Sequence, residues 1–343
     1  MFIKSNLKNY KVEFNYKKKD SILKNKDYIF IIDKNVFKKF NFGKYNIKKK
    51  FLITPTEKVK DFFYLKNIIN KILKFKVNKR STLVAIGGGI VQDITSFLSS
   101  ILFRGINWFY LPTTIIGQCD SCIGGKTSIN YKGIKNQLGN FYPPEKVIIN
   151  FNFLKNLDKT NLSSGIGEMA HYFLVKGGSE LKYFNQNYKK AIDGNMLILP
   201  KLIKKSLLIK KKFIEIDEFD TGIRLLLNYG HSFGHALERY VNNKIPHGVA
   251  VAYGMDISNF ISYKLGFLKK KQFIKIQSDL KEIYKVKKTP RVNIKKYIKF
   301  LEKDKKNIEN KIRVILSRGP GKMFLFKFQN NKKLAKILNI YFN

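Results

Sequence analysis

Histidine, cysteine and proline are scarce in this sequence: 343 residues include only four histidines, two cysteines and eight prolines. The cysteines, Cys119 and Cys122, form one CxxC, and no second CxxC exists to complete a four-cysteine zinc site. A redox pair, half of a zinc site or a turn of small residues would each give this spacing. We expect reduced thiols.

Long apolar runs are also missing. The first residues, MFIKSNLKNY, contain no apolar signal-peptide core, and no run approaches the ~20 apolar residues that a membrane span requires. We therefore expect a cytoplasmic protein without a membrane partner. Because 44% of the residues are hydrophobic and prolines are few, the composition favours a compact, enzyme-sized chain with two domains over a disordered one.

Acidic residues are few as well, with 24 Asp and Glu against 67 Lys and Arg and a formal charge of +43. Such a charge raises the question of nucleic acid. The sequence has no arginine-rich tract, RNP-type aromatic motif or zinc-finger spacing, and its lysines are scattered through every segment. We therefore expect a solvated basic surface and no nucleic-acid partner. The same field would attract a small phosphorylated or carboxylated substrate.

The four histidines all lie between positions 171 and 247, close to Glu168. His231 and His235 are four residues apart and would share one face of a helix. Glu168, His231 and His247 could supply the three ligands that a catalytic zinc needs beside an open position. Spacing alone does not identify the ligands, because HxxxH lacks the glutamate of the zincin pattern, and histidines in satisfied polar cores are the alternative.

The N-terminal half alternates strands with helices. Apolar runs predict strands at 28–33, 51–54, 81–86, 107–111 and 147–149, and helices are expected at 57–74 and 89–104. Between a strand and a helix, Gly87-Gly88-Gly89 would let backbone amides approach a pyrophosphate, although this is not the GxGxxG fingerprint and a tight turn is the alternative.

The C-terminal half has helical periodicity. Apolar residues recur at three-to-four spacing over 181–184, 197–213, 228–240, 250–265 and 272–284. We therefore divide the chain near residue 150. Just before this boundary, the polar, glycine-rich region 120–136 could form a phosphate or polyol pocket, or simply a surface loop.

From Asp33 to Lys306 the chain resembles 3-dehydroquinate synthase and its sugar-phosphate cyclase relatives. The matching motifs occur in the family's order: GGGIVQD (87–93), FRG (103–105), LPTT (111–114), DSCIGGKTSIN (120–130), KNQLGNFYPP (135–144), SGIGE (164–168), DEFDTGIRLLLNYGHSFGHALE (217–238) and HG (247–248). The resemblance implies a Rossmann-like α/β NAD-binding domain over residues 1–151 and a mostly α-helical metal- and substrate-binding domain over residues 152–343.

The resemblance also implies roles for individual residues. Zinc or cobalt would be bound by Glu168, His231 and His247. NAD would contact Asp33, Asn35, Glu57, Lys60, Gly88, Gly89, Asp93, Thr113, Thr114 and Lys135. The substrate would be held or processed by Asp120, Lys126, Asn136, Lys210, Asp220, Arg224, Asn228, His235 and a lysine of the pair Lys305-Lys306, most simply Lys306. Arg104 would reach the substrate phosphate of a partner subunit, which implies a homodimer.

The implied activity is the conversion of 3-deoxy-arabino-heptulosonate 7-phosphate to 3-dehydroquinate with release of phosphate, in the shikimate route to aromatic amino acids. In this family NAD oxidises the substrate transiently, phosphate is eliminated, hydride returns, and the opened ring closes by an intramolecular aldol reaction. His235 suits the proton transfers, because its unperturbed pKa of about 6.5 is close to neutral pH.

His171 departs from the family pattern, which has lysine three residues after the zinc-binding glutamate. Because it shares a helix face with Glu168, we expect His171 to point into the substrate pocket or its rim and count it among the catalytic residues. Three hypotheses follow: a tolerated change in the same enzyme, a cyclase acting on another substrate such as sedoheptulose 7-phosphate, or a degenerate protein. Lys210, Arg224, Asn228 and His235 all match the dehydroquinate-forming members, which favours the first. Outside the family, a related metal-dependent alcohol dehydrogenase remains the nearest alternative enzyme.

Overall fold

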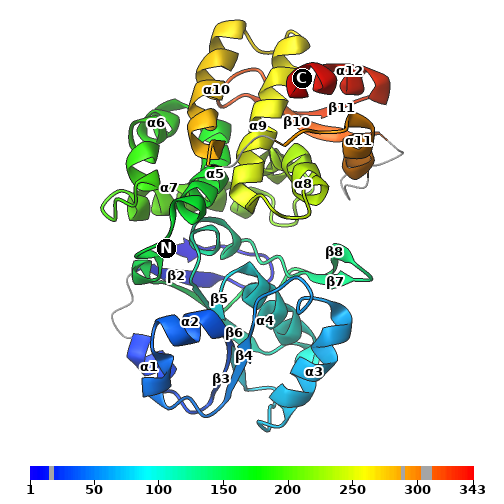
Figure 1. Cartoon of the computed structure of the whole chain (residues 1–343). Coiled ribbons are helices and arrows are strands. Elements are labelled where there is room, and N and C mark those ends of the chain that lie inside the picture. Colours follow the sequence, from blue (N-terminus) through cyan, green and yellow to red (C-terminus); the bar gives the residue numbers. More distant parts are fainter. Residues whose placement is uncertain (15–18, 287–289, 303–310) are drawn as a thin grey trace. The chain divides into compact units, whose positions relative to one another are not determined.

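The chain folds into two units, Met1–Lys155 and Asn156–Asn343, in a computed structural model that describes residues 1–14, 19–286, 290–302 and 311–343. A parallel β-sheet forms the centre of the first unit, and helices form most of the second (Figure 1). The predicted fold class, an α/β domain followed by a mostly helical one, is therefore confirmed.

The sheet of the first unit has seven strands. In spatial order they are β1 (Phe2–Ile3), β2 (Tyr10–Phe14), β9 (Lys146–Ile149), β6 (Asn107–Pro112), β5 (Thr82–Gly87), β3 (Tyr28–Asp33) and β4 (Lys50–Ile53). All neighbouring strands pair in parallel except β1 and β2. The carboxyl ends of the central strands therefore lie along one edge of the sheet, where Gly87 pairs with Pro112.

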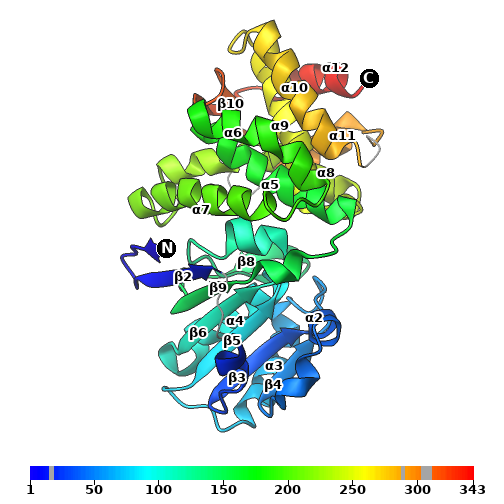
Figure 2. The ribbon, with the colours of Figure 1, turned by 90° about the vertical axis from the view of Figure 1, so that its left-hand side faces the viewer.

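The central strands are buried on both faces, which explains their continuous apolar runs. In β3, Phe30 and Ile32 join a core cluster with residues of α1 (Lys19–Leu23) and of the short helical turns η1 (Phe42–Tyr45) and η4 (Phe151–Leu154). Helix α4 (Gly89–Ile101) packs on β3, β5 and β6. Helix α2 (Lys34–Lys39) contacts β3 and β4, and helix α3 (Phe62–Leu73) contacts β4 (Figure 2).

Two helix boundaries in this unit differ from the prediction. Helix α3 does not begin near Glu57, because the Asp61 carboxylate accepts the backbone N–H of Phe63 and caps the helix there. Glu57 and Lys60 therefore lie in the preceding turn. Helix α4 ends at Ile101, and the chain then passes through η2 (Leu102–Arg104).

Outside the main sheet, the segment after β6 contains a π-helical turn, η3 (Gly117–Ser121), and a small hairpin of β7 (Ile129–Tyr131) and β8 (Ile134–Leu138). The hairpin falls within the region that the sequence left open between a ligand pocket and a surface loop. Cys119 and Cys122 are buried in the same segment and form no disulfide, as predicted. Trp108 of β6 is also buried, and its indole N–H donates to the carbonyl oxygen of Tyr142.

The described residues of the second unit form helices and a hairpin. The helices are α5 (Lys159–Lys176), α6 (Gly178–Ile192), α7 (Leu199–Ile216), α8 (His231–Tyr240), α9 (His247–Lys264), α10 (Lys270–Tyr284), α11 (Ile294–Glu302) and α12 (Asn331–Phe342), and η5 (Ile223–Asn228) precedes α8. Strands β10 (Arg313–Ser317) and β11 (Met323–Lys327) form an antiparallel hairpin that the sequence analysis did not predict.

Helix α9 lies at the centre of this unit and packs on α5, α8 and α10. Every residue from Gly248 to Asn259 is buried. On this helix, Asp256 accepts hydrogen bonds of 2.8 Å from the hydroxyl groups of both Tyr284 and Tyr341. Burial raises the pKa of Asp256. This effect is larger than the opposing effect of the hydrogen bonds, which lower the pKa.

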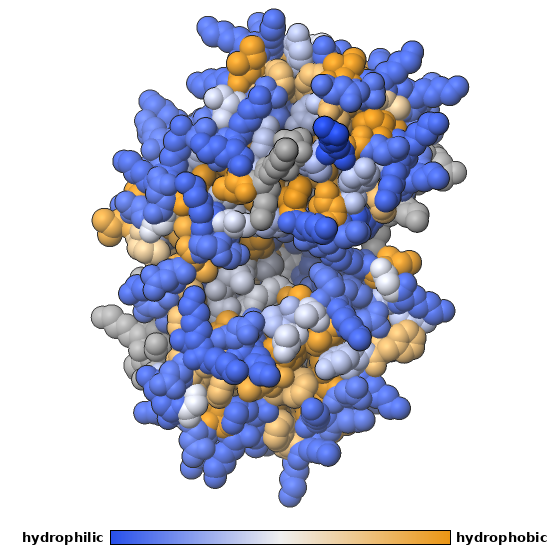
Figure 3. Space-filling model, in the orientation of Figure 1, coloured by the Kyte–Doolittle hydropathy of each residue, from blue (hydrophilic) through white to orange (hydrophobic). Residues whose placement is uncertain are grey.

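The distribution of hydrophilic side chains on the surface agrees with the scattering of lysines along the sequence. Hydrophilic side chains are spread over the visible face of each unit, with small apolar patches between them (Figure 3). Within the described ranges, none of the helices combines the length and apolar character that crossing a bilayer requires.

Candidate functional site

The four histidines gather in the second unit around Glu168. His171 lies on α5 with Glu168, His231 and His235 lie on α8, and His247 opens α9. The ring centroids of His231 and His235 are 5.5 Å apart, so these two residues share a helix face as predicted. His231 is a centre of the cluster, with its ring 4.9 Å from that of His171 and 5.6 Å from that of His247.

The Glu168 carboxylate is only 1% exposed and is the acidic partner of this cluster. One of its oxygens lies 3.5 Å from Nε2 of His231, and the other lies 3.3 Å from Nε2 of His247. Two atoms that each bind a common zinc ion at about 2.1 Å are about 3.0–3.6 Å apart when the angle at the metal is about 90–120°. Glu168 therefore lies from each of the two imidazoles at a separation that two ligands of one divalent cation can have.

Glycines allow the three helices to approach closely enough to build this cluster. A Cβ atom on Gly248 of α9 would overlap the carbonyl oxygen of Ser164 on α5, and one on Gly167 of α5 would overlap the carbonyl oxygen of Gly248. In addition, the backbone N–H of Gly248 donates to the Ser164 hydroxyl at 3.1 Å. These contacts fix His247 next to Glu168.

Helices α8 and α9 approach in the same way. A Cβ atom on Gly254 of α9 would overlap the carbonyl oxygen of Gly230, and one on Gly234 of α8 would lie 2.8 Å from the carbonyl oxygen of Ala250. Gly230 itself has φ +82° and stands at the N-cap of α8, where its conformation favours glycine. The turn places His231 at the first position of the helix.

Glu238 is a site residue that the sequence analysis missed. Its carboxylate lies 3.0 Å from Nδ1 of His247, while Nδ1 of His231 is 3.3 Å from the carbonyl oxygen of Tyr229. Acceptors on Nδ1 orient an imidazole so that its Nε2 is available to a metal. The available signal was the spacing HxxxHxxE, because residues 231, 235 and 238 share one face of α8.

The charges in the cluster reinforce one another. Burial by itself would raise the pKa of Glu168, but the imidazoles of His231 and His247 outweigh it and hold that pKa well below its usual value. Burial would lower the pKa of His247, but Glu238 and Glu168 outweigh it and raise that pKa well above its usual value. Glu168 is therefore ionised, as a cation ligand must be.

The ligand atoms divide into two groups of three. Those of Glu168, His171 and His231 all lie within 4.8 Å of one another, and so do those of His235, Glu238 and His247. The first group includes His171, which the sequence analysis assigned to the pocket but not to the metal.

A second set of predicted residues lies near η5. Asp220 and Asn228 line a cavity of about 230 Å³ together with Ser232 and Arg313. The sequence analysis missed Ser232 and Arg313, and Arg313 belongs to the unpredicted strand β10.

The predicted cations of this unit, Lys210 and Arg224, are 7% and 4% exposed. Arg224 donates through one guanidinium nitrogen to the carbonyl oxygen of Glu218 and through its backbone N–H to Asp217. Its position is therefore fixed by the loop that precedes α8. Lys306, the last predicted substrate residue, lies outside the described residues.

In the first unit, predicted NAD residues lie at the carboxyl edge of the parallel sheet. They follow or end three neighbouring strands: Asp33 ends β3, Gly88 and Gly89 follow β5, and Thr113 and Thr114 follow β6. Asp33 caps α2 by accepting the backbone N–H of Asn35 at 2.8 Å. A nucleotide phosphate is typically bound at this edge, where the backbone N–H groups of α4 point outward.

Gly88 and Gly89 differ in their surroundings. A Cβ atom on Gly88 would lie 3.0 Å from the Thr114 side chain, whereas one on Gly89 would meet nothing within 4 Å. The space over Gly89, at the first position of α4, leaves its backbone open to a ligand.

Lys60, Asp93 and Asn136 form a polar network close to this edge. The Lys60 ammonium lies 2.5 Å from the Asp93 carboxylate and donates to the Asn136 side-chain oxygen at 2.6 Å. Burial raises the pKa of Asp93, although the Lys60 charge opposes the shift. The network brings together two residues assigned to NAD and one assigned to the substrate.

Glu57 and Lys135 lie in the adjoining part of the first unit. Glu57 pairs with Lys135 at 3.3 Å and accepts a hydrogen bond of 2.8 Å from Asn130. Burial would raise the pKa of Glu57, but Asn130 and Lys135 outweigh it and lower that pKa. The three residues line a cavity of about 520 Å³ with Phe63 and Tyr64, whose rings are partly exposed. Aromatic and polar walls of this kind suit a nucleotide.

The other predicted residues of this unit occupy turns and exposed positions. Asp120 lies in η3, and Lys126 is exposed and forms a β-bridge with Phe141. Arg104 is exposed and has φ +60°, next to Phe103 with φ +51°. Two successive residues in this strained region suggest that the turn serves a function.

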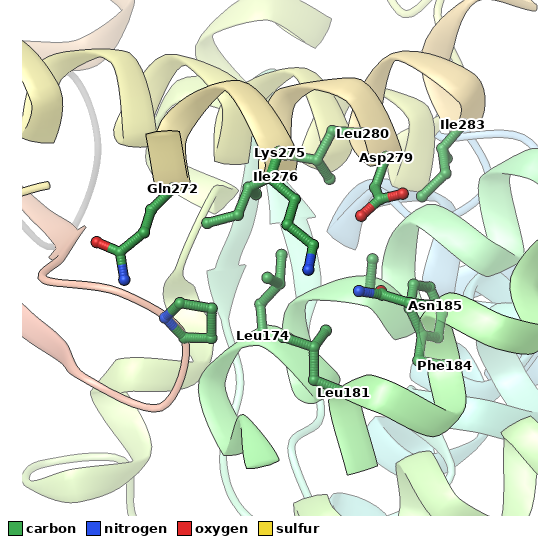
Figure 4. Close-up of a pocket in the computed structure, with 12 residues that line it drawn as sticks. Leu174, Leu181, Phe184, Asn185, Gln272, Lys275, Ile276, Asp279, Leu280 and Ile283 are labelled. Carbon is green, nitrogen blue, oxygen red and sulfur yellow. The ribbon is translucent and has the colours of Figure 1, made fainter. Parts of the chain in front are cut away.

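An apolar cavity of about 220 Å³ lies elsewhere in the second unit, between α5, α6 and α10 (Figure 4). Leu174, Phe184 and Ile276 contribute its apolar wall, and Lys275 and Asp279 contribute charges at one side. Of the predicted site residues that the structure describes, none lines it. Ala170 and Leu174 reach it from a different face of α5 from the one that carries Glu168 and His171.

The chain is similar to known proteins over most of its length. The family description 3-dehydroquinate synthase N-terminal matches residues 50–164, and 3-dehydroquinate synthase C-terminal matches residues 165–307. A 3-dehydroquinate synthase of Clostridium tetani is 35% identical over 294 residues, which cover 86% of this chain and 78% of that protein.

Two solved structures share the fold. A 2-deoxy-scyllo-inosose synthase complexed with carbaglucose-6-phosphate, NAD+ and Co2+ has a TM-score of 0.88 at 21% identity, with 98% of each chain covered. The 2-epi-5-epi-valiolone synthase of Streptomyces hygroscopicus, with NAD+ and Zn2+ bound, has a TM-score of 0.84 at 21% identity, with 96% of each chain covered.

Proposed function

Because the chain belongs to the 3-dehydroquinate synthase family, we propose that it converts 3-deoxy-arabino-heptulosonate 7-phosphate to 3-dehydroquinate and releases phosphate. The observation that carries the proposal is the position of Glu168, whose two carboxylate oxygens lie 3.5 and 3.3 Å from Nε2 of His231 and His247. A buried carboxylate with two imidazoles is a donor set for a catalytic divalent ion.

The proposed cofactors are NAD and a zinc or cobalt ion. Glu168, His231 and His247 would hold the ion, and the ten residues assigned to NAD would hold the nucleotide at the carboxyl edge of the sheet. When bound, the ion supplies Lewis acidity toward a substrate hydroxyl, and NAD supplies a hydride acceptor that is restored later in the cycle. Both cofactors accompany relatives of the same fold.

The buried cations would recognise the substrate. Lys210 and Arg224 are almost fully buried, and a buried cation interacts more strongly with a carboxylate or phosphate than an exposed one does. Asp220 and Asn228 would bind substrate hydroxyl groups from the wall of the η5 cavity. A small anionic, hydroxylated molecule fits this combination.

His235 would move protons during the reaction. It lies one turn after His231 on α8, and its ring is 5.5 Å from that of His247. It is half-buried, so a substrate can reach it. An imidazole can both take and give a proton near neutral pH, which the elimination and ring-closing steps require.

The active assembly would be a homodimer in which Arg104 of one subunit binds the substrate phosphate of the other. The exposed guanidinium and the strained backbone of this turn support that assignment. An arginine is suited to this task because its planar donors match a phosphate in two places at once.

Phosphate release tests the proposal. The purified protein, supplied with zinc and NAD, is offered 3-deoxy-arabino-heptulosonate 7-phosphate and sedoheptulose 7-phosphate in parallel, with Glu168→Gln as the inactive control. Release from the first substrate alone, together with 3-dehydroquinate and without net NADH, is the expected result. Release from the second alone, or from neither, would reject this substrate, and steady NADH accumulation would instead indicate a dehydrogenase.

A further inference from the structure

His171 lies inside the cluster of histidines around Glu168, at a position where the family has lysine. Its side chain is 1% exposed, and its Nδ1 atom is 3.7 Å from the nearer oxygen of Glu168. The two residues are one turn apart on α5, and the His171 ring meets the His231 ring edge to face at 4.9 Å.

A hydrogen bond between His171 and Glu168 does not explain this position. The separation of 3.7 Å exceeds the 2.7–3.2 Å of a protein N–H···O hydrogen bond. It is close to the upper limit, about 3.6 Å, of the separation expected for two ligands of one ion. The ligand atoms of Glu168, His171 and His231 also lie within 4.8 Å of one another, and such a group could hold a metal ion.

We propose that His171 is a ligand of the divalent ion, so that together with His247 the ion is held by Glu168 and three imidazoles. This inference rests on the proposed function for the presence of an ion at the site. It assigns to this chain a ligand that the resemblance does not imply.

The chemistry of the two side chains supports the assignment. A protonated lysine at this position has three donors, no acceptor lone pair and a charge that repels a cation, so it cannot be a ligand. A neutral imidazole offers a lone pair and removes that charge. The change from lysine to histidine therefore adds a donor and strengthens the local attraction for a cation, which we expect to raise metal affinity.

The number of imidazoles at the metal tests the proposal directly. The full-length protein is loaded with one equivalent of zinc, and X-ray absorption at the zinc edge counts the coordinated imidazoles. Three in the wild type and two in His171→Gln are expected. Two in the wild type would overturn the proposal even if the variant fails to fold, and so would an unchanged count in a folded variant.

Zinc affinity provides a second readout, measured by competition with a chelator. His171→Gln should weaken zinc binding about a hundredfold or more, beyond the usual cost of losing an outer-shell partner. His235→Gln is the matched control, because it removes a neighbouring imidazole that the proposal leaves off the metal, and its affinity should stay within about threefold of the wild type. The reverse pattern would place the ion at His235, Glu238 and His247 and overturn the proposal.

These measurements use no substrate, so the two proposals can fail separately. Zinc held by three imidazoles in a protein that releases no phosphate would reject the proposed function alone. Phosphate release by a protein with two imidazoles on its zinc would reject the His171 ligand alone. A protein that retains neither zinc nor cobalt would reject both.

Discussion

Gly248 and Ser164 are in such close contact that no larger residue fits between α9 and α5. A Cβ atom on Gly248 would overlap the Ser164 carbonyl oxygen, and the Gly248 N–H already donates to the Ser164 hydroxyl. His247 directly precedes Gly248, and Glu168 lies one turn after Ser164 on α5. The 3.3 Å separation between Nε2 of His247 and the Glu168 carboxylate therefore depends on this contact.

Gly248→Ala should therefore destabilise the second unit by about 3 kcal/mol or more, because backbone atoms on both sides must move. Urea unfolding followed by far-ultraviolet circular dichroism measures the change. Gly43→Ala is the control, since a Cβ atom there meets nothing within 4 Å, and its stability should not fall. Equal stability of the two variants would show that α5 and α9 separate at little cost.

Glu238→Gln should weaken zinc binding by about 10- to 100-fold, because the carboxylate that orients His247 through Nδ1 loses its charge. Chelator competition measures the affinity. Glu180→Gln serves as the control, since Glu180 pairs with Lys205 on α7 rather than with a site residue. Unchanged affinity in Glu238→Gln would mean that His247 needs no partner to hold its ring.

Asp256→Asn should change the pH dependence of stability. The raised pKa of Asp256 means that the folded state favours the protonated carboxyl, so its contribution is fully present below the unfolded pKa of about 3.9. That contribution is lost as pH rises through the raised folded value. The free energy of unfolding of the variant, relative to wild type, should therefore increase from about pH 4 to neutral pH.

Urea titrations of both proteins across this pH range measure the difference. Asparagine keeps one oxygen for the hydroxyl groups of Tyr284 and Tyr341, so the hydrogen bonds of the site are largely retained. A difference that is constant with pH would contradict the raised pKa.

Mixing two inactive variants should restore activity if Arg104 acts across a dimer. Arg104→Ala and His235→Ala each lack one component, but a hybrid dimer contains one complete site. Random exchange of equal amounts should recover about a quarter of wild-type turnover, since half of the dimers are hybrids with one working site. Phosphate release before and after exchange measures this, and no recovery in proven hybrids would place Arg104 in its own subunit's site.

The sequence predicted the elements whose pattern depends on local burial. Strands such as Tyr28–Asp33 are buried on both faces, so they appear as continuous apolar runs. The bounds of helix α5 were not predicted, because every residue from Leu162 to Val175 is buried and no apolar stripe marks the helix. The hairpin of β10 and β11 was missed although its five-residue strands are longer than β4 and β9, which were predicted.

Some site residues could likewise be predicted from the sequence, and others could not. The resemblance to the 3-dehydroquinate synthase family, which comparison with known proteins confirms, indicated Glu168, His231 and His247 from short motifs. Arg313 required the structure, because it reaches the site through the unpredicted hairpin, whereas the spacing HxxxHxxE was an available signal for Glu238. The functional roles of all these residues stay predictions.

The buried Trp108 and the thiols of Cys119 and Cys122 have a practical consequence. They are the chain's whole supply of tryptophan and cysteine, and all three lie in the first unit. Indole fluorescence and thiol labelling therefore report on the unfolding of that unit alone, while circular dichroism follows mainly the helical second unit. A single sample can thus show whether the two halves melt together or one before the other.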